Sequence, residues 1–535
     1  MTVHGSSGAD DLRVGSTNGF TRLNLNAGEA VGDADVEVDN PVYKVRVLGH
    51  TGDDLVDARG GAGTGAVLRN GPYGRFEFDD VAGEAQSADT VYAGDGPSTL
   101  WGRLGNDKLT AGSGPAELVG GGGADSLTGG PGDDAIEPTT GDDTVAGGAG
   151  NDLLDFYRAP SGVQVDLQAT GPQATRAGRM TIEGIEAVTG SRYADVLKGS
   201  PAGETLFGAQ GNDVLMGRGG DDVLQGDGRY SYTDTGVDTA DFRDASGPVS
   251  VDLTKPAPQA TGAAGSDTFD GIENAIGSEY ADTLIGDEAA NQLDGRGGPD
   301  VLRGGGGADM LAPGSTPRGA ADGADEVDGG ADRDTVSYQG RLYAVAVSLD
   351  GVRNDGADPN RDGVSSASEE GDLATDVEHV TGGTGPDRLT AFGNVANLLD
   401  GGPGDDWFDG GPGGDTLLGQ AGNDTVSYAA RTTRVAVSLG GLWYQDGADP
   451  NGDGVSTRDE EGDWANVENA IGGSGPDRLV AHGAGVNVLT GGPGADVLDA
   501  FDGTSAVDRL VCGTGTDSYR ADPSDALDAC ETAAP

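Results

Sequence analysis

Aspartate recurs in this sequence at a fixed place within a nine-residue unit, and that spacing is the chain's main chemical signal. From residue 93 to residue 155 the chain divides without insertion into AGDGPSTLW, GRLGNDKLT, AGSGPAELV, GGGGADSLT, GGPGDDAIE, PTTGDDTVA and GGAGNDLLD. The sixth position holds Asp107, Asp125, Asp134, Asp143 and Asp152. Stacked units would bring these carboxylates within a few ångströms of one another, which is unstable unless a cation lies between them.

Two other fixed positions predict the element that carries the aspartates. The fourth position is always glycine (Gly96, Gly105, Gly114, Gly123, Gly132, Gly141 and Gly150), and the eighth is always aliphatic (Leu100, Leu109, Leu118, Leu127, Ile136, Val145 and Leu154). Glycine permits a tight turn with positive φ, and the last three residues suit a short strand whose central side chain points inward. Two nonapeptides then form one coil of a flattened parallel β-solenoid, and the stacked coils bury the aliphatic residues between two sheets.

Further copies of the unit occupy residues 190–225, 277–312, 382–390 and 401–427, and an early copy lies at residues 5–13. They place at the sixth position Asp195, Asp213, Asp222, Asp282, Asp300, Asp309, Asp406, Asp415 and Asp424. Glu204 and Asn291 stand at the same position, and we expect weaker cation sites there.

The pattern G-G-x-G-x-D-x-U-x resembles the RTX (hemolysin-type) calcium-binding repeat. The resemblance implies an all-β, right-handed parallel β-roll that binds several Ca²⁺ ions between neighbouring turns, with the position-six aspartates and turn carbonyls as ligands. Because successive turns alternate between two edges, Ser98 and Ala116 fall on one edge, and we expect no metal between them. The opposite edge, with Asp107, Asp125 and Asp143, should hold a row of Ca²⁺.

Four longer segments, here called excursions, interrupt the nonapeptides. They begin at Asp152, Asp238, Asp334 and Asp424, contain a V-x-V-x-L alternation typical of a half-buried strand, and end in GIEAVTG, GIENAIG, DVEHVTG or NVENAIG. We interpret them as parts of one solenoid. The expected divisions are an irregular β-solenoid (1–92), repeat block 1 (93–158), excursions with blocks 2 and 3 (159–228 and 229–312), a linker (313–333), excursions with blocks 4 and 5 (334–427 and 428–511), and a C-terminal cap (512–535).

The third and fourth excursions each contain a second calcium motif. DPNRDGVSSASE (358–369) and DPNGDGVSTRDE (449–460) fit D-x-[DN]-x-[DN]-G-x5-E, the EF-hand loop. The expected ligands are Asp358, Asn360, Asp362, the carbonyl of Val364 and Glu369 in the first loop, and Asp449, Asn451, Asp453, the carbonyl of Val455 and Glu460 in the second. Flanking amphipathic helices are not evident, so an isolated or dockerin-like loop is favoured. The alternative is a solvated acidic turn.

Composition limits the partners and the compartment. The 535 residues include 100 glycines and carry a formal charge of -58, which disfavours nucleic acid and anionic membranes. Such a composition also suits disorder, but a disordered chain has no reason to keep a nine-residue register. No apolar run is long enough for a membrane span. The only cysteines, Cys512 and Cys530, predict one disulfide that fastens the C-terminal cap, and an oxidising compartment.

We therefore expect a secreted or cell-surface protein, although the first residues show no basic region followed by an apolar stretch. The signal has then been removed, or another secretion signal acts, or the protein is intracellular. We expect a monomer, with a glycan or cell-surface molecule as the partner to test.

Catalytic residues are not evident in the sequence. The four histidines (His4, His50, His379 and His482) form no H-E-x-x-H motif, and neither G-x-S-x-G nor G-x-x-x-x-G-K-[ST] occurs. The favoured hypothesis is a non-enzymatic protein whose folding is driven by calcium. One alternative is an extracellular polysaccharide-acting enzyme with a site in residues 1–92. Another is a calcium-dependent adhesin or matrix module with an aromatic patch that includes Trp443 and Tyr444.

Overall fold

The computed structural model describes the chain from residue 88 onward with gaps, and only the strand backbones before it. The described residues are 88–93, 96–227, 236–314, 323–358, 365, 371–439, 446–449, 462–481 and 485–533. This part is all-β and contains no helix, as the nonapeptide pattern predicts.

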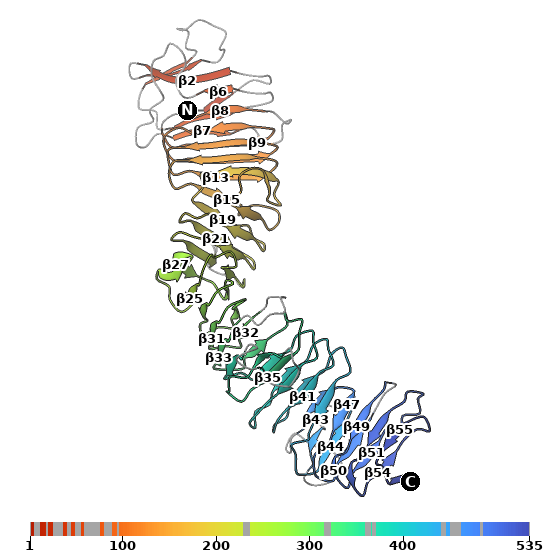
Figure 1. The fold of residues 1–535 in the computed structure, drawn as a ribbon. Helices are drawn as coiled ribbons and strands as arrows, with labels where there is room; N and C mark the ends of the chain where they lie inside the picture. Colours follow the sequence, from red (N-terminus) through yellow and green to blue (C-terminus); the bar gives the residue numbers. More distant parts are fainter. Residues whose placement is uncertain are drawn as a thin grey trace. The chain divides into compact units, whose positions relative to one another are not determined.

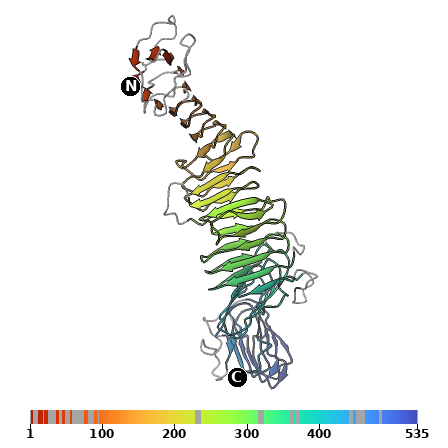
Figure 2. The same ribbon diagram turned by 90° about the vertical axis from the view of Figure 1, so that its left-hand side faces the viewer.

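The chain forms two compact units. Unit 1 comprises residues 1–244 and 255–272, and unit 2 comprises residues 245–254 and 273–535. Within each unit the strands stack one above another as short, nearly parallel rows (Figure 1), and the same stacking is visible from the side (Figure 2).

Unit 1 contains two long sheets and a third, shorter row. The order in the first sheet is β1 (Thr2–His4), β5 (Lys44–Leu48), β7 (Arg75–Asp79), β9 (Ser98–Leu104), β11 (Ala116–Gly122), β13 (Ala135–Thr140), β15 (Leu153–Asp155), β19 (Ala187–Thr189), β21 (Thr205–Ala209), β23 (Val223–Asp227), β27 (Gly265–Asp270) and β26 (Gln259–Gly262). The order in the second is β17 (Gln173–Ala174), β18 (Arg179–Glu183), β14 (Thr144–Gly148), β12 (Ser126–Gly130), β10 (Lys108–Thr110), β8 (Thr90–Tyr92), β6 (Leu55–Asp57), β2 (Asp11–Thr17), β3 (Phe20–Asn24) and β4 (Val36–Asp39). The third row is β16 (Gln164–Asp166), β20 (Val196–Lys198), β22 (Val214–Met216) and β24 (Thr239–Asp241).

Unit 2 repeats this arrangement with four rows and one short pair. The first is β25 (Ser250–Asp252), β29 (Thr283–Ile285), β31 (Val301–Gly305), β33 (Glu326–Gly330) and β37 (Leu373–Thr375). The second is β28 (Asn274–Ile276), β30 (Gln292–Asp294), β32 (Met310–Ala312), β34 (Thr335–Ser337), β38 (His379–Thr381), β40 (Leu398–Asp400), β42 (Thr416–Leu418) and β46 (Trp464–Asn466). The third is β36 (Gly356–Ala357), β35 (Val345–Ser348), β39 (Arg388–Thr390), β41 (Trp407–Asp409), β43 (Thr425–Ser427), β47 (Asn469–Ile471), β49 (Val488–Thr490), β52 (Arg509–Val511) and β55 (Ala526–Asp528). The fourth is β45 (Gly447–Ala448), β44 (Val435–Ser438), β48 (Arg478–Val480), β51 (Val497–Asp499), β54 (Ser518–Arg520) and β56 (Thr532–Ala533), and the short pair is β50 (Pro493–Gly494) with β53 (Thr514–Gly515).

The predicted coil of two nonapeptides is confirmed by the strand register. Leu100 of β9 pairs in parallel with Leu118 of β11, and Leu109 of β10 pairs with Leu127 of β12, so each residue stacks on the one 18 positions later. All seven position-eight residues from Leu100 to Leu154 are 0% exposed. The aliphatic residues therefore form the core between the two sheets, as the periodicity predicts.

Glycine at position four of the first block matches the closeness of successive coils there. Gly123 has a φ of +146°, and a Cβ added there would overlap the carbonyl of Gly105 in the preceding coil. A larger residue at Gly123 would push these two coils apart and strain the parallel hydrogen bonds on both sides of the turn.

The excursions remain part of the stack, and each begins a new row of strands. The predicted V-x-V-x-L strands are β16, β25, β35 and β44, which pair in parallel with β20, β29, β39 and β48. In the first excursion, the row of β14 ends in the antiparallel pair β17–β18, while the row of β15 continues into β19. In the third and fourth, the rows of β33 and β42 end at β37 and β46, while those of β34 and β43 continue into β38 and β47.

The two ends of the chain agree with the sequence prediction as far as they are described. The expected β-structure of residues 1–92 includes β3, β4 and β5, and the early copy at residues 5–13 ends in the first residues of β2. The predicted disulfide between Cys512 and Cys530 is present and joins residues 18 positions apart, the length of one coil.

Candidate metal centre

The position-six residues, here called rungs, form a hydrogen-bonded ladder along each edge of the coils. The main-chain N–H of Asp107 donates to Asp125 Oδ1 at 2.8 Å, and that of Asp125 donates to Asp143 Oδ1 at 2.8 Å. The opposite edge has the same bond from the N–H of Ala116 to Asp134 Oδ1, at 2.7 Å. One oxygen of each carboxylate therefore satisfies a backbone donor of the preceding coil.

The second oxygen of many rungs is buried without a hydrogen-bond partner. Among the described residues this holds for Oδ2 of Asp125, Asp134, Asp143, Asp152, Asp309, Asp334, Asp406, Asp424, Asp496 and Asp517. Each of these residues is at most 2% exposed. A buried anionic oxygen without a donor is costly, so these atoms suit a cation.

The glycine at position one leaves room for that oxygen and brings a carbonyl towards it. A Cβ added at Gly120 would stand 2.5 Å from Asp125 Oδ2 and 3.0 Å from the carbonyl oxygen of Pro138 in the next coil. At Gly129 an added Cβ would overlap both Asp134 Oδ2 and the carbonyl oxygen of Gly147. A carboxylate oxygen and a main-chain oxygen thus converge on one point between two coils.

Burial also shifts the protonation of the rungs. Removal from water raises the pKa of Asp125 and of Asp134 to about 6, and that of Asp143 and of Asp424 to about 7. The backbone hydrogen bond to each carboxylate opposes this shift without cancelling it. The calcium-free fold therefore disfavours the charged form that a cation would need.

This donor set fits Ca²⁺. Calcium takes six to eight oxygen ligands from carboxylates and carbonyls in a flexible geometry. The part of the chain described contains no group of three or more His, Cys, Asp or Glu placed to hold a metal ion. A cation bound here would therefore be held by rung carboxylates together with main-chain carbonyls, as the resemblance implies.

Two of the predicted rungs have both carboxylate oxygens occupied by backbone donors. Asp282 accepts the N–H of Val249 through Oδ1 at 2.8 Å, and its Oδ2 accepts the N–H of Ser278. Asp195 is held in the same way by the N–H groups of Val163 and Ser191. In each case the first donor comes from the excursion strand, so these carboxylates fasten the excursion to the roll and are less suited to calcium.

The ladder also passes through rungs that the nine-residue spacing missed. The predicted rungs Asp107, Asp213, Asp300 and Asp415 accept ladder bonds from the preceding coil. Beyond them the step lengthens: Asp213 donates to Asp238, 25 residues later, and Asp222 donates to Asp267, 45 residues later. The remaining missed rungs are Asp89, Asp325, Asp334, Asp372, Asp463 and Asp508. Four further rungs, Asp387, Asp477, Asp496 and Asp517, stand at position six of later copies of the unit, at residues 382–390, 472–480, 491–499 and 512–520. Following the ladder through the insertions could have found the missed rungs.

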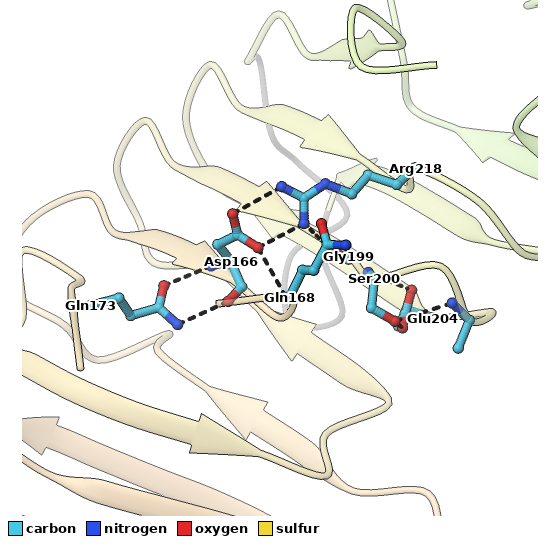
Figure 3. Close-up of polar contacts among 8 residues, drawn as sticks. Asp166, Gln168, Gln173, Gly199, Ser200, Glu204 and Arg218 are labelled. Carbon is cyan, nitrogen blue, oxygen red and sulfur yellow. Dashed lines mark hydrogen bonds and ion pairs between the residues drawn. The ribbon is translucent and has the colours of Figure 1, made fainter. Parts of the chain in front are cut away.

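Glu204, which departs from the pattern, is satisfied by its own turn. Its Oε2 accepts the N–H of Ser200 at 3.1 Å, its Oε1 accepts the Ser200 hydroxyl, and its N–H donates to Asp222 Oδ1 at 2.8 Å. Nearby, Arg218 binds Asp166 through both terminal nitrogens, at 2.7 and 2.9 Å, and donates to the carbonyl of Gly199 (Figure 3). The positive charge beside the Glu204 turn is therefore that of the Arg218 guanidinium.

The two EF-hand-like loops are described only at their bases. Asp358 and Asp449 are buried, and Asp449 forms an ion pair with Arg434 at 3.1 Å. The other expected ligands, Asn360, Asp362, Val364, Glu369, Asn451, Asp453, Val455 and Glu460, lie outside the described residues. Each loop is closed at its base by an antiparallel bridge, Asp355–Asp372 or Asp446–Asp463, so it needs no flanking helices to bring its ends together.

One hollow lies on the outer face of unit 1, over β11, β13 and β15. It measures about 460 Å³, and its lining includes Glu117, Glu137, Asp155, Tyr157 and Arg192. The guanidinium of Arg192 lies 4.6 Å from the centre of the Tyr157 ring. Side chains of residues 1–87 and the residues Trp443 and Tyr444, named in the alternative hypotheses, lie outside the described part.

Nothing in the described residues forms an apolar helix of membrane-spanning length. His379 lies on β38, half-buried, and burial lowers the pKa of its imidazole.

Comparison with known proteins agrees with the geometry. A family model described as the RTX calcium-binding nonapeptide repeat matches residues 86–115, 117–138, 139–156, 182–214, 198–228, 276–311, 320–337, 393–426 and 483–504. A search of the curated proteins found no match.

Proposed function

Because this chain is an RTX repeat protein, we propose that it is a non-enzymatic protein of the cell surface or the extracellular medium whose folding is driven by Ca²⁺ bound between coils. The observation that carries the proposal is the row of buried Oδ2 atoms without hydrogen-bond partners, such as those of Asp125 and Asp143. The aspartates Asp107, Asp125 and Asp143 would hold a row of ions on one edge, and Asp134 and Asp152 would hold ions on the other.

The energetics of such a switch are adequate. A site occupied at ten times its dissociation constant stabilises the folded state by about 1.4 kcal/mol. Ten such sites would contribute roughly 14 kcal/mol, which is comparable to the whole stability of an ordinary domain. Without calcium, a chain of net charge -58 repels itself, and buried rung oxygens such as Asp125 Oδ2 and Asp143 Oδ2 have no hydrogen-bond donor.

The extracellular location rests on two chemical arguments. A disulfide such as Cys512–Cys530 persists in oxidising compartments. Extracellular calcium modules bind at about 10⁻⁴–10⁻³ M, so weak sites would fill outside the cell and stay empty in a cytosol poor in calcium.

The decisive experiment compares the whole chain in chelator and in millimolar Ca²⁺. Far-UV circular dichroism and small-angle scattering should report an expanded, largely unfolded chain in chelator, and a compact β-rich one in calcium. Magnesium at the same concentration is the control, because its smaller ion demands octahedral geometry. A compact β-rich state in chelator would overturn the proposal.

The hollow over β11, β13 and β15 favours a second candidate, a calcium-dependent glycan-binding module. Its lining combines an aromatic ring, Tyr157, with carboxylates and Arg192, which suits stacking and hydrogen bonding to sugar rings. Binding to a glycan array in calcium that is lost in Tyr157→Ala and retained in Tyr193→Ala would support this glycan-binding function. Equal binding by both variants, or no binding by the natural chain, would exclude it.

A further inference from the structure

Three rungs in unit 2 carry asparagine in place of aspartate: Asn291, Asn397 and Asn487. They are buried, at 3%, 6% and 3% exposure. Their main-chain N–H groups continue the ladder, donating at 2.8 Å to Oδ1 of Asp309, Asp415 and Asp508. The backbone of these coils is therefore arranged as in the aspartate coils, and the difference lies in the side chain.

The amide nitrogen of each asparagine donates to a main-chain carbonyl of the preceding coil. Asn291 Nδ2 donates to Glu273 at 2.7 Å, Asn397 Nδ2 to Glu378 at 2.9 Å, and Asn487 Nδ2 to Glu468 at 2.7 Å. An amide N–H thus points at an oxygen in the gap between coils. A cation in that gap would meet two hydrogen atoms of partial positive charge.

The glutamates that accept these bonds share one place in the sequence. Each is the glutamate of the segment that ends an excursion, GIENAIG, DVEHVTG or NVENAIG. The first excursion ends in GIEAVTG, and the rung one coil after Glu186 is Glu204, which its own turn satisfies. After every excursion, therefore, the rung one coil beyond the closing glutamate is not aspartate.

The residue at position one gives independent support. Ala391 and Ala481 begin the units of Asn397 and Asn487, and Ala93 and Ala111 begin those of Ser98 and Ala116. At Gly410, the glycine that begins the coil after Ala391, an added Cβ would stand only 2.6 Å from Asp415 Oδ2. A methyl group at the corresponding place in Ala391 or Ala481 would therefore crowd the second oxygen of a rung carboxylate. The residue at position one does not decide this alone, since Pro138 begins the unit of Asp143. Asn291 keeps a glycine, Gly286, and there its Oδ1 accepts the N–H of Asp287 at 2.7 Å.

We propose that Asn291, Asn397 and Asn487 close three inter-coil positions against calcium and hold those coils together by an amide–carbonyl bond instead. The proposal rests on the proposed function, since it concerns where a calcium row is interrupted. The roll is then divided, at the end of each excursion, into calcium-dependent stretches separated by joints that need no metal.

The test converts a closed position into an open one. Asn291→Asp should gain at least one Ca²⁺ per chain, because Gly286 already leaves the space. The double variant Ala391→Gly/Asn397→Asp should gain at least one, and Asn397→Asp should bind its added ion more weakly than the double variant, because the Ala391 methyl group crowds the second oxygen. Ala391→Gly alone is the control and should leave the count unchanged. The calcium bound by each full-length chain is measured by equilibrium dialysis with elemental analysis.

A second measurement uses the lowest calcium concentration that folds the natural chain. There Asn291→Asp should lower the urea midpoint, because it replaces an amide–carbonyl bond with a buried carboxylate whose site is not yet filled. If the natural chain binds calcium but neither Asn291→Asp nor the double variant binds an additional ion, this inference alone is overturned. No calcium uptake by the natural chain would overturn the proposed function, and the inference with it.

Discussion

At the scale of single residues, Asp125 shows how the two oxygens of a rung can be separated by mutation. Asp125→Asn keeps an oxygen that can accept the Asp107 N–H, whereas Asp125→Ala removes it. In millimolar calcium we expect the asparagine variant to lose about 1.4 kcal/mol of unfolding free energy, the contribution of one filled site. The alanine variant should lose about 1–3 kcal/mol more, because it also leaves the Asp107 N–H without an acceptor. Urea unfolding in calcium measures both losses, and equal losses in the two variants would contradict the ladder.

The space that glycine leaves at position one can also be tested by mutation. Gly129→Ala would push a methyl group into Asp134 Oδ2 and the carbonyl oxygen of Gly147, whereas Gly219→Ala meets only Pro201 Cα, at 3.9 Å. We expect the first variant to raise the calcium concentration needed for folding several-fold, and the second to leave it unchanged. Calcium titrations followed by circular dichroism give the midpoints, and matching midpoints would refute the spatial argument.

Sequence spacing predicts which residues are rungs but not which of them are open to a cation. Asp125 and Asp282 occupy the same position of the same motif, yet only Asp282 has both oxygens bound to N–H groups. The difference comes from Oδ2, which in Asp282 accepts the N–H of Ser278 four residues earlier, so the conformation of the local turn decides it. Asn291 stands out in the sequence as a departure from position-six aspartate. Asn397 and Asn487 could have been recognised too, since their side chains and the alanines that begin their units both depart from the motif.

At the scale of elements, the terminal coil offers a direct test. The bond from Cys512 to Cys530 closes a loop as long as one coil around β54 and β55. Such a loop should stabilise the native coil by about 3 kcal/mol. We expect Cys530→Ser to speed amide exchange in β52, β54 and β55, because contacts in a stacked protein extend only to neighbouring coils. Exchange in β9 to β14 should not change; a change there would show that the roll responds as a whole.

The elements themselves were largely predictable, and the exceptions have a physical cause. Aliphatic residues every nine positions predict the short parallel strands, and V-x-V-x-L predicts β16, β25, β35 and β44. The antiparallel partners β17, β26, β36 and β45 were not predicted, because they are two to four residues long and carry no alternation. Insertions also hid the long ladder steps, such as that from Asp222 to Asp267.

At the scale of the whole molecule, the buried carboxylates give the calcium-free chain an unusual pH dependence. Burial raises the pKa of Asp143, Asp222 and Asp424 from 3.8 to about 7. Between pH 3.8 and about pH 7, the folded chain therefore binds more protons than the unfolded chain. The resulting stability is fully present below pH 3.8 and is lost as the pH rises through about 7. In chelator, the residual β-structure measured by circular dichroism should therefore be greater at pH 5 than at pH 7.5.

Calcium should reverse that order. The ion needs deprotonated rungs, so the calcium-loaded chain should be more stable at pH 7.5 than at pH 5, where protons compete for the same oxygens. Urea midpoints in calcium at both pH values, and the residual β-structure in chelator at the same pH values, complete the comparison. Residual β-structure in chelator that is unchanged or greater at pH 7.5 would contradict the raised pKa values.

The rows of strands within each unit never end together, and this has a mechanical consequence. Where β14 gives way to β18 and β17, the row of β15 continues into β19; where β42 ends at β46, the row of β43 continues into β47. The two rows are therefore interrupted at different coils. If the stack were stretched along its axis, the parallel hydrogen bonds of the continuous row would have to break before the coils on either side of an excursion could separate. The excursions thus lengthen the sequence without creating a level at which both rows are interrupted.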